Sequence, residues 1–432
     1  MTTAGASLVA AVALVAVVPT AAQEPSTPRV TISANRLVAS DSTGEMVEPH
    51  LSVSPVDPRH VVAAAMIIRE PDFSVMDCAL LTSFDGFEST TRHDLGLEQC
   101  GDPWTLITEA GTAIVTVLSE RGLLVYRSPD GGRSWPSEPL VIDGAHDHEM
   151  LTADRATGAI YLVSGLSARS PTGTLQSLIC VARSTDDGRT FEEMGRTAVS
   201  NMSYEAMTPV VASDSELLIP LQDHHRGDGE RVRMRRAWLL ASSDGGRTTA
   251  PPRLINEGCN RRGPVGWPSL GIVPTGARTG AGDAAVDRLV WLCEREEHDG
   301  IDLFTSDDRG ESWTGPRRVD EEREGAWTKV PTVAVDARGA VAVAWSDRGP
   351  GEDCHALRVA ISFDAAETFA PPRQIASERS CPVDTDVGAR FPAGGDYIGL
   401  AATSPRSFLA LWSDARDGVF RLYRATVSVR EE

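Results

Sequence analysis

A short turn motif recurs six times along the chain, and this repeat limits the fold more than any other feature. Three copies match the pattern S-x-D-x-G-x-x-[WF] in full: Ser128-Pro-Asp-Gly-Gly-Arg-Ser-Trp135, Ser184-Thr-Asp-Asp-Gly-Arg-Thr-Phe191 and Ser306-Asp-Asp-Arg-Gly-Glu-Ser-Trp313. Three more are degraded, because 242–249 lacks the aromatic residue and both 83–90 and 362–369 lack the glycine. A unit repeated in this way predicts a stacked or radial architecture rather than two or three separate domains.

The residue types of the motif suit a tight turn between two antiparallel strands. Ser and Asp side chains can accept hydrogen bonds from backbone amides that the turn leaves unpaired, and Gly supplies a position with positive φ. The aromatic residue is expected to pack back between neighbouring sheets. These aspartates could also be catalytic acids or calcium ligands, but a repeated structural turn is the favoured interpretation. The motif therefore predicts the fold and leaves the activity open.

Four short strand patterns surround each turn. Segments with the composition of an inner first strand, several of them opening on Pro, begin at Glu48, Asp102, His148, Thr208, Trp267, Val330 and Asp396. This regular spacing predicts an all-β fold, a seven-bladed β-propeller of four-stranded antiparallel blades. The last unit supplies only three strands, so we expect Arg29-Val-Thr-Ile-Ser33 to complete that blade and close the ring. Six blades, with one unit as an insertion, is the alternative.

The N-terminal segment indicates an exported protein. Leu8–Val18 is an apolar run of signal-peptide length, and small residues at Thr20 and Ala22 suit cleavage after Ala22, although no Lys or Arg precedes the run. We therefore assign 1–22 as a signal peptide, 23–28 as a short linker and 29–430 as one propeller domain. A secreted protein is expected, with no integral membrane segment after cleavage.

The formal net charge of −20, with Lys329 the only lysine, disfavours nucleic acid and anionic membranes as partners.

The repeated motif resembles the Asp-box, or bacterial neuraminidase repeat, and nearly all of the mature chain is similar to the sialidase-like β-propeller superfamily. This resemblance implies a ligand site where the first strands begin, over the central channel. In that family a Tyr nucleophile is activated by a Glu, an Asp is the general acid, and three arginines hold the substrate carboxylate. Transferred to this chain, these roles fall on Tyr397, Glu205 and Asp102 for catalysis and on Arg69, Arg295 and Arg348 for the clamp.

Other polar and aromatic side chains of the same rim are expected to bind substrate: Trp104, His148, Glu149, Trp267, Lys329 and Asp396. Charges at the mouth of a channel are costly unless they are paired or used. The run His146-Asp-His-Glu149 could also hold a metal, but on a strand only His146 and His148 share a side. Solvated loop residues are favoured there, and we expect neither a metal nor another cofactor.

The seven cysteines fit an exported protein. In a propeller of this class the repeated turns occupy one rim, which places most of the cysteines on the opposite rim. We predict the disulfides Cys78–Cys100, Cys354–Cys381 and Cys259–Cys293. Cys180, within a third strand, is expected to be a buried free thiol.

One departure from the family pattern narrows the function. Where the resemblance requires Arg-Ile-Pro at the first inner strand, this chain has Val47-Glu48-Pro49, and the nearest match is Lys329-Val-Pro331 in blade six. The departure argues against sialic acid as the substrate and leaves open another glycan-directed hydrolase or lyase. We predict a secreted, monomeric, sialidase-like propeller that acts on or binds a glycan or glycoprotein, and an exo-glycosidase if it is an enzyme. The alternatives are a non-catalytic extracellular propeller that binds carbohydrate or protein, and a cell-envelope scaffold.

Overall fold

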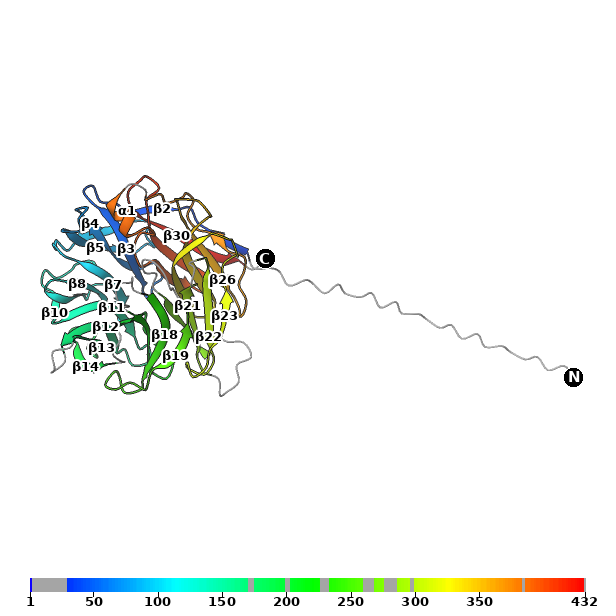
Figure 1. Cartoon of the computed structure of the whole chain (residues 1–432), viewed down its shortest axis with the longest axis horizontal. Coiled ribbons are helices and arrows are strands. Elements are labelled where there is room, and N and C mark those ends of the chain that lie inside the picture. The colour runs from blue at the N-terminus through cyan, green and yellow to red at the C-terminus, as the bar shows by residue number, and fades with distance from the viewer. Residues whose placement is uncertain are drawn as a thin grey trace.

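The computed structural model describes residue 1 and residues 29–169, 175–198, 203–225, 233–258, 268–275, 286–295, 299–382 and 385–430. Within these ranges the chain forms seven antiparallel sheets around a central axis, as Figure 1 shows. The prediction of a seven-bladed β-propeller is therefore confirmed, and the six-bladed alternative is wrong.

The blades follow one another along the chain, and each runs outward from its first strand. Blades one and two contain β3 (Glu45–Val53), β4 (Val61–Ile68), β5 (Met76–Ser83), β6 (Thr91–Asp94), and β7 (Gly101–Ile107), β8 (Ala113–Ser119), β9 (Gly122–Ser128), β10 (Leu140–Ile142). Blades three and four contain β11 (Ala145–Ala153), β12 (Ile160–Arg169), β13 (Leu175–Ser184), β14 (Glu192–Thr197), and β15 (Ser203–Ala206), β16 (Val210–Val211), β17 (Leu217–His225), β18 (Arg233–Ser242), β19 (Arg253–Glu257). Blades five and six contain β20 (Ser269–Val273), β21 (Arg288–Glu294), β22 (Ile301–Ser306), β23 (Thr314–Arg318), and β24 (Trp327–Val335), β25 (Val341–Arg348), β26 (Ala356–Ser362), β27 (Arg373–Gln374). Blade seven contains β28 (Gly399–Ser404), β29 (Ser407–Asp414), β30 (Arg421–Arg430) and, from the N-terminal end, β1 (Arg29–Ile32) and β2 (Arg36–Ala39).

The ring is closed by strands from both ends of the described domain. β1 pairs antiparallel with β30, from Arg29 opposite Arg430 to Ile32 opposite Val427, as the sequence predicts. β2 pairs with the other half of β30, which the sequence did not indicate. The first strands contact their neighbours in an unbroken circle, from β3 through β7, β11, β15 and β16, β20, β24 and β28 back to β3. The first strands therefore surround the central channel.

All six repeated turns, called here the Ser/Asp turns, have the same hydrogen bonds. The serine hydroxyl donates to the aspartate two residues later (2.6–2.9 Å) and accepts the backbone N–H four residues later (2.7–2.9 Å). The aspartate in turn accepts the backbone N–H and the hydroxyl of a Ser or Thr six residues after the serine. The degraded copies keep the geometry, because Phe87 and Ala366 adopt the positive φ that Gly supplies elsewhere (62° and 68°).

The glycine of the Ser/Asp turn also allows close contact with the preceding blade. A Cβ atom on Gly188 would lie 2.4 Å from Ile114 Cδ1, and one on Gly246 would lie 2.4 Å from Val181 Cγ1. Such distances are far below van der Waals contact, so the turns of blades three and four require Gly for space as well as for φ. The turns therefore join neighbouring blades as well as neighbouring strands.

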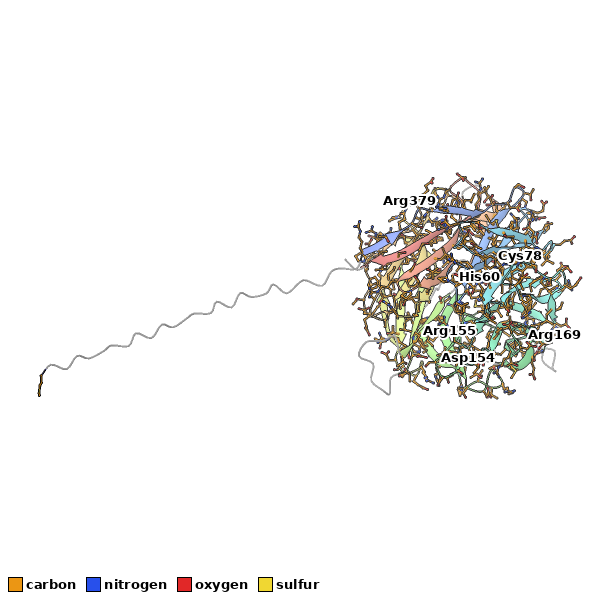
Figure 2. The ribbon with its side chains drawn as sticks, turned by 180° about the vertical axis from the view of Figure 1, so that it is seen from behind. His60, Cys78, Asp154, Arg155, Arg169 and Arg379 are labelled. Atoms are coloured by element: carbon orange, nitrogen blue, oxygen red, sulfur yellow. A yellow bond between two sulfur atoms is a disulfide. The ribbon has the colours of Figure 1, made fainter. Side chains whose placement is uncertain are left out.

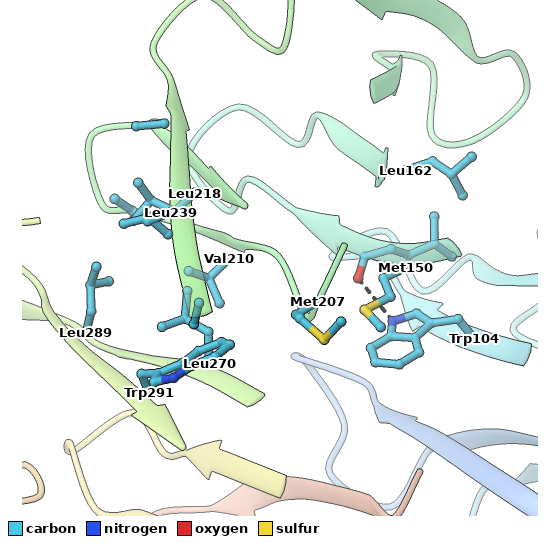
Figure 3. Close-up of a cluster of buried hydrophobic side chains, with 14 of the residues drawn as sticks. Trp104, Met150, Leu162, Met207, Val210, Leu218, Leu239, Leu270, Leu289 and Trp291 are labelled. Carbon is cyan, nitrogen blue, oxygen red and sulfur yellow. Dashed lines mark hydrogen bonds between the residues drawn. The ribbon is translucent and has the colours of Figure 1, made fainter. Parts of the chain in front are cut away.

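Apolar side chains from adjacent blades fill the spaces between the sheets. Figure 3 shows one such cluster, in which Trp104, Met150 and Met207 from successive blades pack together. The Trp104 indole N–H donates to the Leu151 carbonyl across the blade boundary (3.2 Å, Figure 3). Burial of this kind is the main driving force for closing the ring.

The disulfide predictions are confirmed where the structure describes both cysteines. Cys78 is bonded to Cys100 and Cys354 to Cys381, and Cys180 is a buried free thiol. Cys78 is labelled in Figure 2, which shows the molecule from the reverse side. Cys293 is disulfide-bonded, while its predicted partner Cys259 lies outside the described residues.

Two disulfides are compatible with an exported protein. The predicted signal peptide lies outside the described ranges. The one helix within them, α1 (Asp386–Arg390), has five residues, so no described helix has the length to cross a membrane.

Candidate functional site

Four of the first strands contain the same β-bulge near the channel. The pairing to the second strand skips two residues between Val47 and His50, and it does so again in β7, β11 and β24. The first skipped residue has positive φ each time: Glu48 (55°), Asp102 (49°), His148 (53°) and Val330 (56°). Non-glycine residues rarely adopt this conformation, which costs about 1–3 kcal/mol and is concentrated at functional sites. Three of these four strained positions carry ionisable side chains, and they occupy equivalent places in their blades.

Glu149 departs from the pattern of these bulges. The residue after the strained position is Pro49, Pro103 or Pro331 in the other three strands, where a missing N–H suits the unpaired position. Blade three places Glu149 there instead, and its side chain is completely buried (0% exposed). A glutamate thus occupies the position that proline has in the other three bulges.

The bulges and the chain before β28 bring a group of ionisable side chains together, called here the channel cluster. It consists of Glu48, Asp102, Asp147, His148, Glu149, Glu205, Asp396 and Tyr397, each close enough to others to shift a pKa. These residues come from blades one, two, three, four and seven. Of the predicted site residues, the cluster thus unites the catalytic trio with His148, Glu149 and Asp396.

The carboxyl groups of the cluster repel one another. Burial raises the pKa of Glu48 well above its ordinary value, and Asp102 and Asp396 raise it further, whereas Arg390 opposes the change. Burial also raises the pKa of Glu149, with Asp102 the largest charged contributor. Both residues are therefore stabilised as neutral carboxylic acids at a higher pH than ordinary glutamates.

Asp102 and His148 shift each other's pKa within the channel cluster. Burial raises the pKa of Asp102, His148 lowers it, and Asp147 and Glu205 raise it again, so that the net change is upward. Burial alone would lower the pKa of His148, but Asp102 and the other carboxylates raise it above its ordinary value. Asp102 is partly exposed while His148 is buried, which leaves the aspartate as the group that a ligand can reach.

Aromatic rings pack around Tyr397, beside the carboxyl groups of the channel cluster. The phenolic oxygen of Tyr397 lies 3.5 Å from His148 Nδ1, and its ring is nearly perpendicular to that of Trp104, with centroids 5.6 Å apart. Trp104 in turn stacks on His50 at 3.7 Å, and its indole is only 7% exposed. Trp104 therefore supports Tyr397 from within the core and offers little surface on which a sugar could stack.

Tyr397 is held as a neutral phenol. Burial raises its pKa well above the ordinary value, and Asp102, Glu48, Asp396 and Glu149 raise it further. A phenolate at this position would add a negative charge to a site that already has an excess of them. Tyr397 is thus suited to donate a hydrogen bond, and a nucleophilic role would need a base to remove its proton.

Two fully buried side chains of this region have no hydrogen-bond partner within the described residues. Both carboxyl oxygens of Glu149 and both amide atoms of Gln222 are unsatisfied. Gln222 lies opposite Glu205 in the β15–β17 pair, and opposed residues share a face of the sheet. Leaving such groups unpaired costs about 1–3 kcal/mol each, which a ligand or water could recover.

Lys329 is part of an ion pair. Its Nζ atom lies 2.7 Å from Glu294 Oε2, both side chains are almost completely buried, and the other carboxyl oxygen accepts the Val330 N–H at 2.9 Å. The predicted substrate-binding lysine therefore neutralises a carboxylate of blade five at the fourth bulge.

The three predicted clamp arginines are held by contacts away from the channel cluster. Arg69 pairs with Asp41 and Asp77, Arg295 pairs with Asp299 and Asp302, and Arg348 lies over the ring of Trp327. They occupy blades one, five and six, and each contacts side chains near its own blade. Trp267, predicted to bind substrate, lies outside the described residues.

Sequence reasoning gave no role to Glu48 or Gln222. The Glu-Pro pair at 48–49 parallels Asp-Pro at 102–103, so the repeated residue before proline was an available signal for Glu48. Gln222 follows the apolar residues of β17, and nothing in its sequence context distinguishes it from a solvated polar residue.

Comparisons with known proteins support the fold. The sequence matches no protein-family model, and no curated protein matches it. Among solved structures, a protein of unknown function from Dyadobacter fermentans has a TM-score of 0.50 at 12% identity, covering 93% of this chain and 99% of that one. A Hadza microbial sialidase has a TM-score of 0.49 at 14% identity (86% and 76% covered).

Two further solved structures are similar to this chain at comparably low sequence identity. The sialidase of Trypanosoma rangeli has a TM-score of 0.44 at 11% identity, with 88% of this chain and 53% of that protein covered. An α-L-arabinofuranosidase from Fusarium graminearum has a TM-score of 0.46 at 13% identity (74% and 93% covered). Such low identities assign this chain no reaction.

Proposed function

We propose that this propeller is a secreted, glycan-directed hydrolase whose acid–base chemistry takes place at the channel cluster. The observation that carries the proposal is the convergence of carboxyl groups from five blades beside a phenol and an imidazole, with their pKa values displaced by burial. Glycoside cleavage requires one carboxyl group that holds a proton and a second that is ionised. Perturbed pKa values that cluster in this way are typical of functional sites.

Asp102 is the proposed general acid. Its raised pKa keeps it protonated at a higher pH than an ordinary aspartate, and its partial exposure allows contact with a leaving group. Glu205 and Asp396, which are also partly exposed, are the candidates for the base or nucleophile. Tyr397 would donate a hydrogen bond beside them.

The electrostatics favour a substrate without a carboxylate. The resemblance to sialidases implies an arginine clamp, but Arg69, Arg295 and Arg348 are engaged elsewhere, and the cluster itself is rich in carboxyl groups. An anionic sugar would meet repulsion there, whereas a neutral or cationic sugar would not. We therefore propose a glycan other than a sialoside.

The test is hydrolysis of a panel of aryl glycosides and polysaccharides by wild type, Asp102→Asn and Glu205→Gln. Asn adopts positive φ readily, so Asp102→Asn should retain the bulge while losing the proton donor. Loss of a general acid should lower kcat/KM about 10²–10⁴-fold, and the basic limb of the wild-type pH profile should report the raised pKa of Asp102.

Glu109→Gln is the matched control for this test. Glu109 is an exposed carboxylate just beyond the other end of the strand that begins with Gly101 and Asp102, so it gives the same charge change far from the cluster. Its activity should equal that of wild type. Full activity of Asp102→Asn, or no turnover of any glycoside by wild type, would refute the enzymatic proposal.

Binding without cleavage is the second candidate function. It is favoured by the burial of Tyr397 (7% exposed) and Glu149 (0%), which leaves few of the reactive groups at the surface. In that case a glycan array should show retention by wild type, together with no hydrolysis of the retained glycan.

A further inference from the structure

A short loop before β28, called here the Gly–Gly loop (394–396), passes between two other parts of the ring. A Cβ atom on Gly394 would lie 2.5 Å from Ser413 Cβ in blade seven. One on Gly395 would lie 2.2 Å from Glu48 Cγ in blade one. Both glycines also have positive φ (84° and 111°). The loop is therefore in such close contact with both blades that a larger residue would displace it.

Glu48 holds the Gly–Gly loop by two hydrogen bonds from blade one. Its backbone N–H donates to the Gly394 carbonyl at 2.9 Å, and its side-chain Oε1 accepts the backbone N–H of Asp396 at 3.3 Å. Glu48 is the strained residue of the first bulge, with a φ of 55°, and it is only 3% exposed. The bulge takes Glu48 out of the pairing with β4, so its backbone N–H is available to the neighbouring blade.

The residues at the end of the loop have roles in the proposed reaction. Asp396 is a candidate base or nucleophile, and Tyr397 would donate a hydrogen bond beside it. The contact between Tyr397 and Trp104 of blade two fixes the side chain rather than the backbone. The backbone position of both residues therefore follows that of the loop. A displacement of about 1 Å in reacting groups can lower a rate roughly 10²-fold.

The ring contains a second hydrogen bond of this kind. At the fourth bulge, Oε1 of the buried Glu294 in blade five accepts the backbone N–H of Val330 in blade six at 2.9 Å. Val330 is the strained residue of that bulge. A buried glutamate that accepts a backbone N–H from an adjacent blade is thus used twice, once to hold a first strand and once to hold the Gly–Gly loop.

Glu48 can accept this hydrogen bond without carrying a negative charge. Burial raises its pKa well above the ordinary value, and Arg390 opposes the change only in part. The carbonyl oxygen of a neutral carboxylic acid accepts an N–H as the oxygen of an amide does. Glutamine at this position should therefore keep the bond, whereas methionine, which has a similar length and no oxygen, should lose it.

We propose that Glu48 is a positioning residue, which fixes the backbone of Asp396 and Tyr397 from the neighbouring blade and takes no part in proton transfer itself. This inference rests on the proposed function, because that function assigns the two positioned residues their roles. It makes the contact between blades one and seven part of the site.

Hydrogen exchange followed by mass spectrometry tests the contact without a substrate. In Glu48→Met the peptide that contains 394–397 should exchange at least about tenfold faster than in wild type, because the Asp396 N–H loses its acceptor. Glu48→Gln should exchange as wild type does. Glu45→Met is the matched control, since Glu45 Oε2 accepts the Phe420 N–H at 2.9 Å across the same two blades. It should leave exchange at 394–397 unchanged.

The kinetic measurement uses the aryl glycoside that wild type cleaves best in the panel described above. Glu48→Met should lower kcat at least about tenfold and change KM less than about threefold, because displaced groups affect the reaction more than binding. Glu48→Gln should retain at least about a third of the wild-type kcat, with the basic limb of the pH profile in place. Glu45→Met should match wild type. Recovery by glutamine is not expected of a residue whose charge or proton takes part in the reaction.

Three results would overturn the inference and leave the proposed function in place. They are a loss of kcat in Glu48→Gln as large as in Glu48→Met, exchange in Glu48→Met as slow as in wild type, and equally accelerated exchange in Glu45→Met. If Glu48→Met does not fold, Glu48→Gln decides, because wild-type exchange and kcat support positioning and loss of either refutes it. If wild type cleaves no glycoside, the proposed function fails, and the exchange measurement alone decides whether Glu48 holds the loop.

Discussion

Removal of the Lys329 ammonium group should lower the free energy of unfolding, because it removes the counter-charge of the buried Glu294 carboxylate. Lys329 and Glu294 are 4% and 0% exposed, and 2.7 Å separates their charged atoms. Lys329→Met retains most of the side-chain volume but leaves Glu294 buried without its counter-charge. Breaking a buried pair from one side costs about 3–5 kcal/mol, a large part of the roughly 5–15 kcal/mol that stabilises a typical domain.

A second variant distinguishes the charge effect from lost packing. In Lys329→Met/Glu294→Gln the amide oxygen can still accept the Val330 N–H, which now bonds to Glu294 Oε1 at 2.9 Å, and no charge remains buried. The double variant should recover at least half of the stability lost in the single one, because a neutral pair avoids the desolvation of an isolated charge. The measurement is equilibrium unfolding in urea followed by tryptophan fluorescence, with the slope m compared among variants.

The loss should also depend on pH in a defined direction. Without Lys329, burial of Glu294 without that counter-charge disfavours its ionised form in the folded protein. The penalty is then complete near neutral pH and disappears below about pH 4, where Glu294 is protonated in both states. A loss below about 1 kcal/mol, or one that is the same at acid and neutral pH, would refute the reasoning.

Three further predictions concern the turns and the site. Ser128→Ala removes the acceptor of the buried Gly132 N–H (2.7 Å) and should lower the free energy of unfolding by about 1–3 kcal/mol, whereas the exposed control Ser134→Ala should lose less than about half a kcal/mol; equal losses in urea unfolding would contradict this. Gly395→Ala places a Cβ atom 2.2 Å from Glu48 Cγ at a φ of 111°, so it should displace Glu48 and reduce ligand affinity by calorimetry at least tenfold, an idea that unchanged affinity would disprove. Thermal stability should be greatest at weakly acidic pH. Hydrogen bonds lower the pKa of the turn residues Asp85, Asp130, Asp186 and Asp244 to about 2, so the stability that these aspartates contribute is lost as pH falls from about 4 toward that value. The pKa values of Glu48 and Glu149 are raised instead, so the stability that these glutamates contribute is lost as pH rises through their raised pKa values. Scanning calorimetry across pH measures this, and a stability that climbs steadily up to alkaline pH would be inconsistent with it.

The fold was predictable because its main signal is local. Each Ser/Asp turn is built from hydrogen bonds within eight consecutive residues, so six copies indicate six hairpins without knowledge of tertiary contacts. The Ser or Thr hydroxyl that donates to each aspartate was visible in the sequence, yet its role was recognised only from the structure. β2 and α1 were not predicted.

The site was predictable only in part. The rim positions of Asp102, Glu149 and Tyr397 follow from strand order, which the repeat gives. The bulges shift the strand starts, so that β3 begins at Glu45 rather than at Glu48. Side-chain partners depend on contacts between segments far apart in sequence: Arg69 is held by Asp41, and Lys329 by Glu294, and no spacing rule connects those pairs.

The pairing of β1 with β30 has a consequence for how the molecule is made. The Thr31 hydroxyl donates to the Ser428 carbonyl at 3.1 Å across 397 residues, so β1 leaves the ribosome long before its partner β30 and is among the last of the described strands to pair. Until the final strand has been synthesised the blades form an open arc with two bare ends, and closing so long a loop is intrinsically slow. A truncated chain thus exposes two unpaired sheet edges, and chaperones and proteases act on exposed edges of this kind.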